Sequence, residues 1–102
     1  MSVLTITEQN FEEEVVKANK TVIIDFYADW CGPCKMMSPV IDGLADELGK
    51  TVKVGKVNVD ENMNLAEKFG IMSIPTIIVF KNGGVTATFN GVTAKDEIKA
   101  VI

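Results

Sequence analysis

Histidine is absent from this chain of 102 residues, and cysteine occurs only twice. A structural zinc ion needs about four nitrogen, sulfur or oxygen ligands, usually from two Cys-x-x-Cys pairs or from added histidines. Covalent haem needs a histidine directly after the second cysteine, where this chain has Lys35. The sequence therefore argues against both groups, and we expect no metal site.

Basic clusters and long apolar runs are also missing. The net charge is −4, and an acidic surface without basic clusters repels phosphate backbones, so we expect no nucleic-acid partner. The longest apolar run, Ile77-Ile78-Val79-Phe80, is far shorter than the roughly 18 residues of a membrane-spanning helix, so we expect no membrane partner. The N-terminus lacks the basic start and apolar stretch of a signal peptide, which predicts a cytoplasmic protein.

The length suits one domain that spans residues 1–102 and buries one core. Hydrophobic periodicity predicts alternating strands and helices. The expected strands cover residues 3–6, 22–28, 52–59, 76–80 and 85–89. The expected helices cover residues 8–18, the cysteine motif up to residue 48, a short segment between residues 60 and 70, and the residues after 93. This order predicts one α/β domain with a mixed sheet and helices on both faces.

Residues at the expected ends of these elements have the chemistry of caps and turns. N-cap oxygens are expected from three residues, namely Thr7, Asp60 and Thr93. Gly70 is expected to end the third helix in the left-handed conformation that glycine tolerates. Asn82-Gly83 predicts a hairpin turn between the last two strands.

The two cysteines, Cys31 and Cys34, lie where a buried strand is followed by a helix. Their spacing places both on one face of the helix start, close enough for a disulfide. At the first position, unsatisfied N–H groups and the helix dipole favour the thiolate of Cys31. Cys34 belongs to the apolar stripe of the helix, so we expect Cys31 to be exposed and Cys34 to be buried. The alternative is a pair of inert core cysteines.

This asymmetry predicts thiol–disulfide exchange. Cys31 attacks a substrate disulfide and forms a mixed disulfide. Cys34 then attacks the Cys31 sulfur, which releases the reduced substrate and closes the Cys31–Cys34 bond. Between the cysteines, Gly32 leaves the turn unobstructed, and Pro33 stiffens the loop by fixing φ, which favours the dithiol.

Asp25 lies in the apolar strand that precedes the cysteines. An ionised carboxylate loses solvation there, so its pKa is expected to be raised. Beneath the thiols, it would accept the proton of Cys34 during the second exchange step. In the alternative, it lies at a sheet edge or faces water. Lys56, in the third strand, is either its partner or an outward-facing lysine.

Pro75 precedes the fourth strand and follows Ser73-Ile74. A cis bond before Pro75 would expose the Ile74 backbone to an extended substrate, whereas a turn residue has no such role. The sequence leaves the isomer open. Met36 and Met37 are expected to pack inside the protein, as adaptable core residues do.

Together these motifs resemble the thioredoxin family over almost the whole chain. The resemblance rests on Val22–Ala28, Asp29-Trp30-Cys31-Gly32-Pro33-Cys34-Lys35, Pro39, Lys56-Val57-Asn58-Val59-Asp60, Gly70-Ile71, Ile74-Pro75-Thr76, Phe80-Lys81-Asn82-Gly83 and Gly91. It implies a thioredoxin fold, with a central mixed sheet of five strands flanked by four helices. It also implies a cis Ile74–Pro75 bond packed against the cysteines.

The resemblance further implies roles for individual residues. Cys31 would be the nucleophile, Cys34 the resolving thiol, Asp25 the buried proton-transfer group and Lys56 its neighbour. The active-site loop would hold Trp30, Gly32 and Pro33, and an apolar docking groove would be formed by Trp30, Val59, Ile74, Pro75 and Gly91. The chain would be a monomeric protein-disulfide reductase and electron carrier without a cofactor. Its partners would be disulfide-containing client proteins and a separate thioredoxin reductase.

Four features depart from the common pattern of the family. Tyr27 stands where many members have tryptophan, which leaves Trp30 as the sole tryptophan. Asn90 stands where an apolar groove residue is common, and Ser73 replaces a frequent glycine or alanine. The chain ends at Ile102, several residues earlier than usual, so we expect a short last helix.

Two other functions compete with disulfide reduction. A binding module would use the same surface without cysteine chemistry, but the complete Cys-Gly-Pro-Cys motif and Asp25 argue against it. A dedicated oxidant or isomerase usually differs at the two residues between the cysteines and resides outside the cytosol. Gly32-Pro33 and the absent leader therefore favour the reductase.

Overall fold

The computed structural model describes residues 3–102. The first two residues of the expected domain lie outside the described part, and so does the start of the N-terminus that is expected to carry no signal peptide. Within residues 3–102, strands and helices follow in the order β1 (Leu4–Thr5), η1 (Glu12–Val16), β2 (Thr21–Tyr27), α1 (Gly32–Leu48), β3 (Val52–Asn58), α2 (Met63–Lys68), β4 (Thr76–Lys81), β5 (Gly84–Asn90) and α3 (Lys95–Lys99). This order is the one that hydrophobic periodicity predicts. No helix in the described range is long and apolar enough to cross a membrane.

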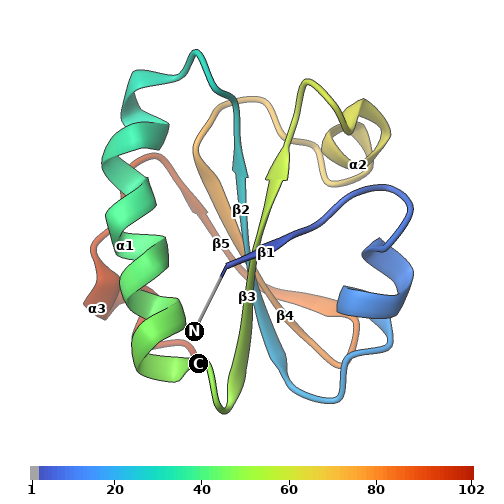
Figure 1. Cartoon of the computed structure of the whole chain (residues 1–102), viewed down its shortest axis with the longest axis vertical. Coiled ribbons are helices and arrows are strands. Elements are labelled where there is room, and N and C mark those ends of the chain that lie inside the picture. Colours follow the sequence, from blue (N-terminus) through green and yellow to red (C-terminus); the bar gives the residue numbers. More distant parts are fainter. Residues whose placement is uncertain (1–2) are drawn as a thin grey trace.

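The five strands of the described range form one mixed sheet in the order β1-β3-β2-β4-β5. β3 runs parallel to both β1 and β2, whereas β4 runs antiparallel to β2 and to β5. Figure 1 shows the sheet nearly edge-on between two helical layers, with α1 and α3 on one face and η1 and α2 on the other. The α/β class and the mixed five-stranded sheet are therefore confirmed.

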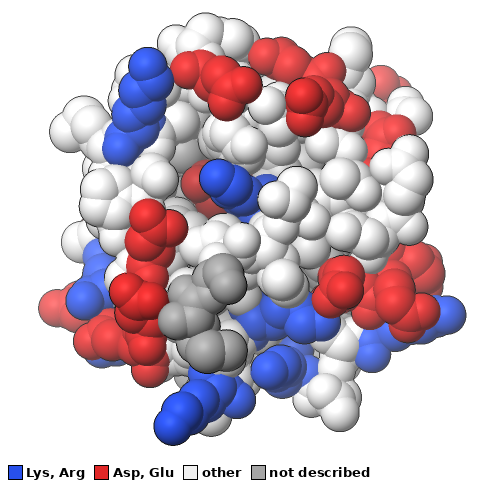
Figure 2. All heavy atoms as spheres, viewed as in Figure 1, with Lys and Arg blue, Asp and Glu red and all other residues white. Residues whose placement is uncertain are grey.

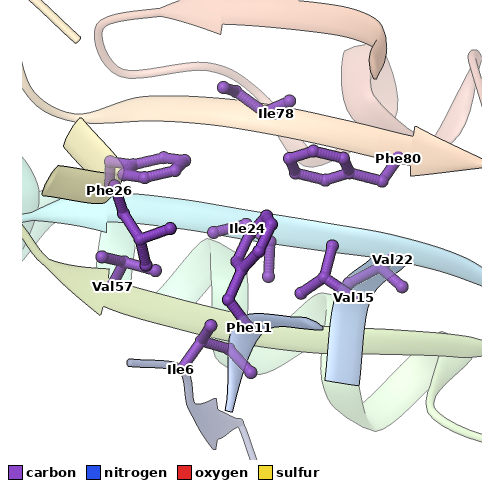
Figure 3. Packing of buried hydrophobic residues seen from close by; sticks show 10 residues of the cluster. Ile6, Phe11, Val15, Val22, Ile24, Phe26, Val57, Ile78 and Phe80 are labelled. Atoms are coloured by element: carbon purple, nitrogen blue, oxygen red, sulfur yellow. The ribbon is translucent and has the colours of Figure 1, made fainter. Parts of the chain in front are cut away.

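The central strand β2 sends alternate side chains into two cores. Val22, Ile24 and Phe26 pack with residues of η1 and α2, and Figure 3 shows the tight packing of this cluster. Ile23 packs on the opposite face with residues of α1 and α3. Asp25 follows the same alternation as Ile23, so its carboxyl group lies on the α1 face of the sheet.

Gly55 in β3 is required by the close approach of the first strand. It lies opposite Leu4 in the parallel pair of β1 and β3. A Cβ at this position would lie 2.7 Å from Cγ1 of Ile6 and 3.3 Å from Cδ1 of Ile24. A side chain here would therefore collide with the Ile6 side chain, just after β1, and force it to shift.

The first helix is shorter than its expected span of residues 8–18. The cap expected at Thr7 is wrong, because the N-cap position is Phe11 and no described side chain caps this end. Thr7 instead closes the preceding turn, where its hydroxyl accepts the Asn10 N–H at 3.3 Å and the Asn10 side-chain oxygen accepts the Thr7 N–H at 2.7 Å. The following residues form a π-helical turn, in which the Lys17 N–H bonds to the Glu12 carbonyl at 2.9 Å. The expected α-helix is thus replaced by η1 over Glu12–Val16.

The cap expected at Asp60 for the start of α2 is wrong. The N-cap position is Asn62, and the Asn64 N–H donates to the Glu8 carboxylate at 2.9 Å. A side chain 56 residues away in the sequence therefore satisfies one N–H at the helix start, which no local pattern could reveal. At the far end, Gly70 has the predicted left-handed conformation with a φ of 63°.

The start of α3 also differs from expectation. Its N-cap is Ala94, and the Thr93 hydroxyl donates to the Gly91 carbonyl at 3.0 Å instead of capping the helix. The hairpin between β4 and β5 is as predicted, because Asn82 and Gly83 both have positive φ values, 53° and 79°.

Candidate active site

Cys31 occupies the N-cap of α1. Its backbone is extended, with φ −87° and ψ 113°, and the helix begins at Gly32. The Cys31 sulfur accepts the backbone N–H of Cys34 at 3.1 Å. A sulfur in this position lies where free N–H groups and the helix dipole stabilise negative charge. Pro33 fits the first turn, because its missing N–H would have had no partner there.

A disulfide joins Cys31 to Cys34, with the two Cα atoms 5.3 Å apart. This separation lies within the usual range for a disulfide. The pairing predicted from the spacing of the two cysteines is therefore present, and the structure describes the oxidised protein.

The expected exposure of Cys31 is wrong. Cys31 is 4% exposed and Cys34 is 5% exposed. Val59 and Ile74 pack against the pair, and the Cys31 sulfur lies 3.8 Å from the Ile74 carbonyl oxygen. Its N-cap position holds this sulfur beneath neighbouring loops, which the linear sequence does not show. The two cysteines therefore differ in their place on the helix, not in overall burial.

Asp25 is buried on the α1 face of the sheet and is 4% exposed. Burial raises its pKa from 3.8 to about 7, and the nearby charge of Lys56 only partly opposes this rise. Its Oδ1 atom has no hydrogen-bond partner within residues 3–102. A buried carboxyl group that titrates near neutral pH can hold or release a proton under physiological conditions.

One cavity connects Asp25 with the disulfide. It has a volume of about 150 Å³, and its lining includes Asp25, Cys34 and Lys56. Figure 2 shows a hollow near the centre of the visible face, where a basic side chain lies beside an acidic one. The structure thus brings together the three groups that the sequence placed in the second exchange step, in a space large enough for several water molecules.

Lys56 acts on Asp25 through its charge and not through a direct ion pair. Asp25 and Lys56 are register partners in β2 and β3. Among the described residues no ion pair between them lies within 4.0 Å, and the Lys56 ammonium lies 5.3 Å from the centroid of the Tyr27 ring. Lys56 is half-buried and lines the same cavity as Asp25.

A groove of about 290 Å³ lies beside the disulfide. It is lined by Trp30, Val59, Asp60, Met63, Ala66, Ile71, Met72, Ser73 and Ile74. Trp30 is 71% exposed, and its indole N–H donates to the Asp60 carboxylate at 2.8 Å. Three of the five residues expected in a docking groove, Trp30, Val59 and Ile74, therefore share this lining.

Pro75 and Gly91 lie outside that lining but next to it. The Ile74–Pro75 peptide bond is cis. The Gly91 N–H donates to the Pro75 carbonyl at 2.8 Å, and Gly91 has a positive φ of 87°. A Cβ on Gly91 would have no neighbour within 4 Å. Gly91 is therefore half-buried beside Pro75, with free space where a side chain would begin.

The methionines show both a confirmed and a wrong expectation. Met37 is fully buried, as expected, but Met36 is 66% exposed because successive residues of a helix point about 100° apart. Sequence reasoning missed Met63 and Met72, which line the groove and are 71% and 97% exposed. For Met63 the available signal was a large apolar residue directly between Asn62 and Asn64, whereas Met72 stands among apolar residues and has no such signal.

These features together define a class of protein. A disulfide at a helix start is a bond that can be opened by reduction and closed by oxidation. The buried carboxyl group beside it can take up a proton that a thiol releases. The fold and the site are those of a thiol–disulfide oxidoreductase.

Comparison with known proteins identifies the family. The thioredoxin family model matches residues 2–102. Similar curated proteins, each named thioredoxin, include one from Allochromatium vinosum, 45% identical over 101 residues and covering 99% of this chain and 94% of the relative. Another from Porphyra purpurea is 41% identical over 102 residues, which is 100% of this chain and 95% of the relative. A third from Rickettsia felis is 46% identical over 93 residues, which is 91% and 89%. The chain belongs to the thioredoxin family.

Proposed function

We propose that this chain reduces disulfides in client proteins, with Cys31 as the attacking thiol and Cys34 as the resolving thiol. The observation that carries the proposal is the Cys31 sulfur at the N-cap of α1, where it accepts the Cys34 N–H at 3.1 Å. In the reduced protein, the same position stabilises a Cys31 thiolate.

The exchange proceeds in two steps that balance. The Cys31 thiolate attacks one client sulfur, so the client disulfide breaks, a Cys31–client bond forms and one client thiolate is released. The Cys34 thiolate then attacks the Cys31 sulfur, which forms the Cys31–Cys34 disulfide and releases the second client thiolate. Each client thiolate takes up a proton from water. The client gains two electrons, and this chain loses two.

Asp25 serves the second step as a proton acceptor. Its carboxylate and Cys34 line the same cavity, and a pKa of about 7 leaves about half of the Asp25 carboxyl groups ionised at neutral pH. Water in the cavity would carry the proton from Cys34 to Asp25. Lys56, the register partner of Asp25, favours the ionised carboxylate.

The groove supplies the docking surface for the client. Val59 and Ile74 pack against the cysteines and also line the groove. A client segment bonded to Cys31 would therefore lie along Trp30 and Ile74, with Pro75 and Gly91 at its edge. Because Cys31 is buried, this docking must bring the client sulfur close before attack begins.

Several further features accompany this function. A thioredoxin reductase would return two electrons to the Cys31–Cys34 bond, because the exchange leaves this chain oxidised. The cytoplasm suits a dithiol carrier because it is reducing.

A monomer leaves the groove free for a client. One domain over residues 1–102 agrees with cores that join residues from Ile6 to Ile98. Sedimentation velocity would test the monomer.

Single cysteine variants test the mechanism. With insulin as the disulfide substrate, Cys31→Ser should abolish reduction. Cys34→Ser should still attack but accumulate a mixed disulfide through Cys31, visible by mass spectrometry as a covalent adduct that dithiothreitol releases. The double variant is the matched control and should form no adduct. Full activity of Cys31→Ser would overturn the proposal. If Cys34→Ser does form adducts, the same variant immobilised on a column would identify the client proteins.

A further inference from the structure

We infer that Met63 and Met72 form a peroxide-sensitive modification site, whose oxidation to methionine sulfoxide weakens the docking of client proteins. The inference rests on the proposed docking function of the groove. It adds a means of regulation that the exchange chemistry does not contain.

The two methionines combine exposure with a position in the groove wall. Met72 is 97% exposed and Met63 is 71% exposed. Both line the groove together with Trp30 and Ile74. Met72 lies two residues before Ile74, whose carbonyl oxygen is 3.8 Å from the Cys31 sulfur. A change at these thioethers is therefore a change in the wall of the groove that also contains Ile74.

The reaction needs hydrogen peroxide and balances without a further reagent. The methionine sulfur donates an electron pair to one peroxide oxygen, so the O–O bond breaks, an S–O bond forms and water leaves. The sulfur is oxidised by two electrons and the peroxide is reduced by two. Methionine sulfoxide reductases reverse such a modification, which makes it suitable for regulation.

The product changes the character of the groove. Apart from Asp60 and Ser73, the groove lining is made of apolar side chains. A thioether is a flexible apolar contact surface, whereas a sulfoxide carries a strongly polar oxygen. A client that covers this oxygen must remove its hydration without offering a hydrogen bond in return, which weakens docking.

The chain contains its own comparison residues. Met36 is 66% exposed but does not line the groove, so its oxidation should leave docking unchanged. Met37 is fully buried, and its sulfur accepts the Thr93 N–H at 3.5 Å, so it should resist peroxide. In the oxidised protein both cysteine sulfurs are bonded to each other, so no thiolate competes for peroxide.

The experiment treats the disulfide form of the full chain with hydrogen peroxide and maps sulfoxides by peptide mass spectrometry. After removal of peroxide and brief reduction with dithiothreitol, two rates are measured. One substrate is insulin, which must dock, and the other is bis(2-hydroxyethyl) disulfide, which is too small to fill the groove. We expect fast oxidation of Met63 and Met72, slow oxidation of Met37, and about a 5- to 10-fold loss with insulin alone.

Leucine variants separate the groove from the rest of the chain. Each variant is compared with its own untreated sample. Met63→Leu/Met72→Leu has no thioether in the groove and should lose no insulin rate on peroxide treatment. Met36→Leu, the matched control, should lose as much as the unchanged protein.

Two results would overturn the inference. The first is an unchanged ratio of the two rates when both sulfoxides are present. The second is an equal peroxide-induced loss in the groove double variant. If the untreated protein reduced neither substrate, the proposed function itself would be wrong, and the docking effect would fall with it.

Discussion

Asp25 and Lys56 are register partners on the parallel strands β2 and β3, and both line the cavity that reaches Cys34. Two effects act on the Asp25 carboxyl group. Burial raises its pKa and the Lys56 charge lowers it, and burial is the larger effect, so the pKa reaches about 7. The charge of this buried site therefore changes within the physiological pH range.

The first prediction concerns stability against pH. Between the ordinary pKa of 3.8 and the folded value of about 7, the folded protein keeps a proton that the unfolded chain releases. The free energy of unfolding therefore falls from about pH 4 to about pH 7 because of Asp25, and this contribution is constant above that range. Asp25→Asn cannot ionise, so it should be more stable than the unchanged protein by up to about 4 kcal/mol at pH 8.

Urea unfolding of the disulfide form at pH 4, 6 and 8 would measure this difference. Other carboxyl groups affect both proteins alike, so the difference between the curves isolates Asp25. It should shrink steadily as the pH is lowered and vanish near pH 4. A difference that is the same at all three pH values would contradict the prediction.

The second prediction concerns Lys56. Lys56→Met removes the charge that favours ionised Asp25, so the pKa of Asp25 should rise further above 7. Carbon-13 NMR titration of the Asp25 carboxyl group measures this directly. Lys53→Met is the matched control, because the Lys53 ammonium binds Glu14 at 2.9 Å and should leave the Asp25 pKa unchanged. An equal shift of the Asp25 pKa in both variants would contradict the prediction, because it would come from the net charge of the protein and not from Lys56 in particular.

The third prediction compares two glycine-to-alanine changes. In Gly55→Ala the new Cβ would lie 2.7 Å from Cγ1 of Ile6, so the variant should be less stable by about 1–3 kcal/mol. In Gly43→Ala, inside α1, the nearest atom is Cδ of Lys95 at 3.7 Å. The second variant should gain up to about 1 kcal/mol, because alanine favours helix. Denaturant unfolding measures the change in the free energy of unfolding for both variants. Changes of the same sign would contradict the tight packing described at Gly55.

The fourth prediction concerns the bond between the Trp30 indole and the Asp60 carboxylate. Asp60→Ala removes the acceptor at 2.8 Å, so the indole should become more mobile. Fluorescence anisotropy of this sole tryptophan should fall. Insulin reduction should slow by about 2- to 5-fold, which corresponds to the net free energy of one exposed hydrogen bond. Glu61→Ala, which removes the neighbouring carboxylate, is the control. Unchanged anisotropy in Asp60→Ala would show that the bond does not hold Trp30.

Sequence reasoning was strongest where the signal is local. The order of strands and helices, the Asn82-Gly83 turn and the left-handed Gly70 follow from patterns a few residues long. The same applies to the disulfide, because a spacing of three residues at a helix start brings two sulfurs together. The raised pKa of Asp25 was predictable because a single carboxylate interrupts an apolar strand.

Sequence reasoning failed where distant segments meet. The start of α2 is satisfied by Glu8, which is 56 residues from Asn64. The burial of Cys31 depends on Val59 and Ile74, which reach it from other loops. Met63 and Met72 share a groove although they belong to different segments, so nothing in either segment marks them as neighbours.

The sequence by itself determined the class of this protein and its disulfide, since periodicity and the cysteine spacing are properties of short stretches of chain. Only the tertiary structure decided what surrounds that bond. Burial of the Cys31 sulfur, the shared cavity of Asp25, Cys34 and Lys56, and the groove with two exposed methionines all arise from packing between elements. Packing sets solvent access and local charge, so it raises the pKa of Asp25, buries Cys31 and leaves Met63 and Met72 exposed.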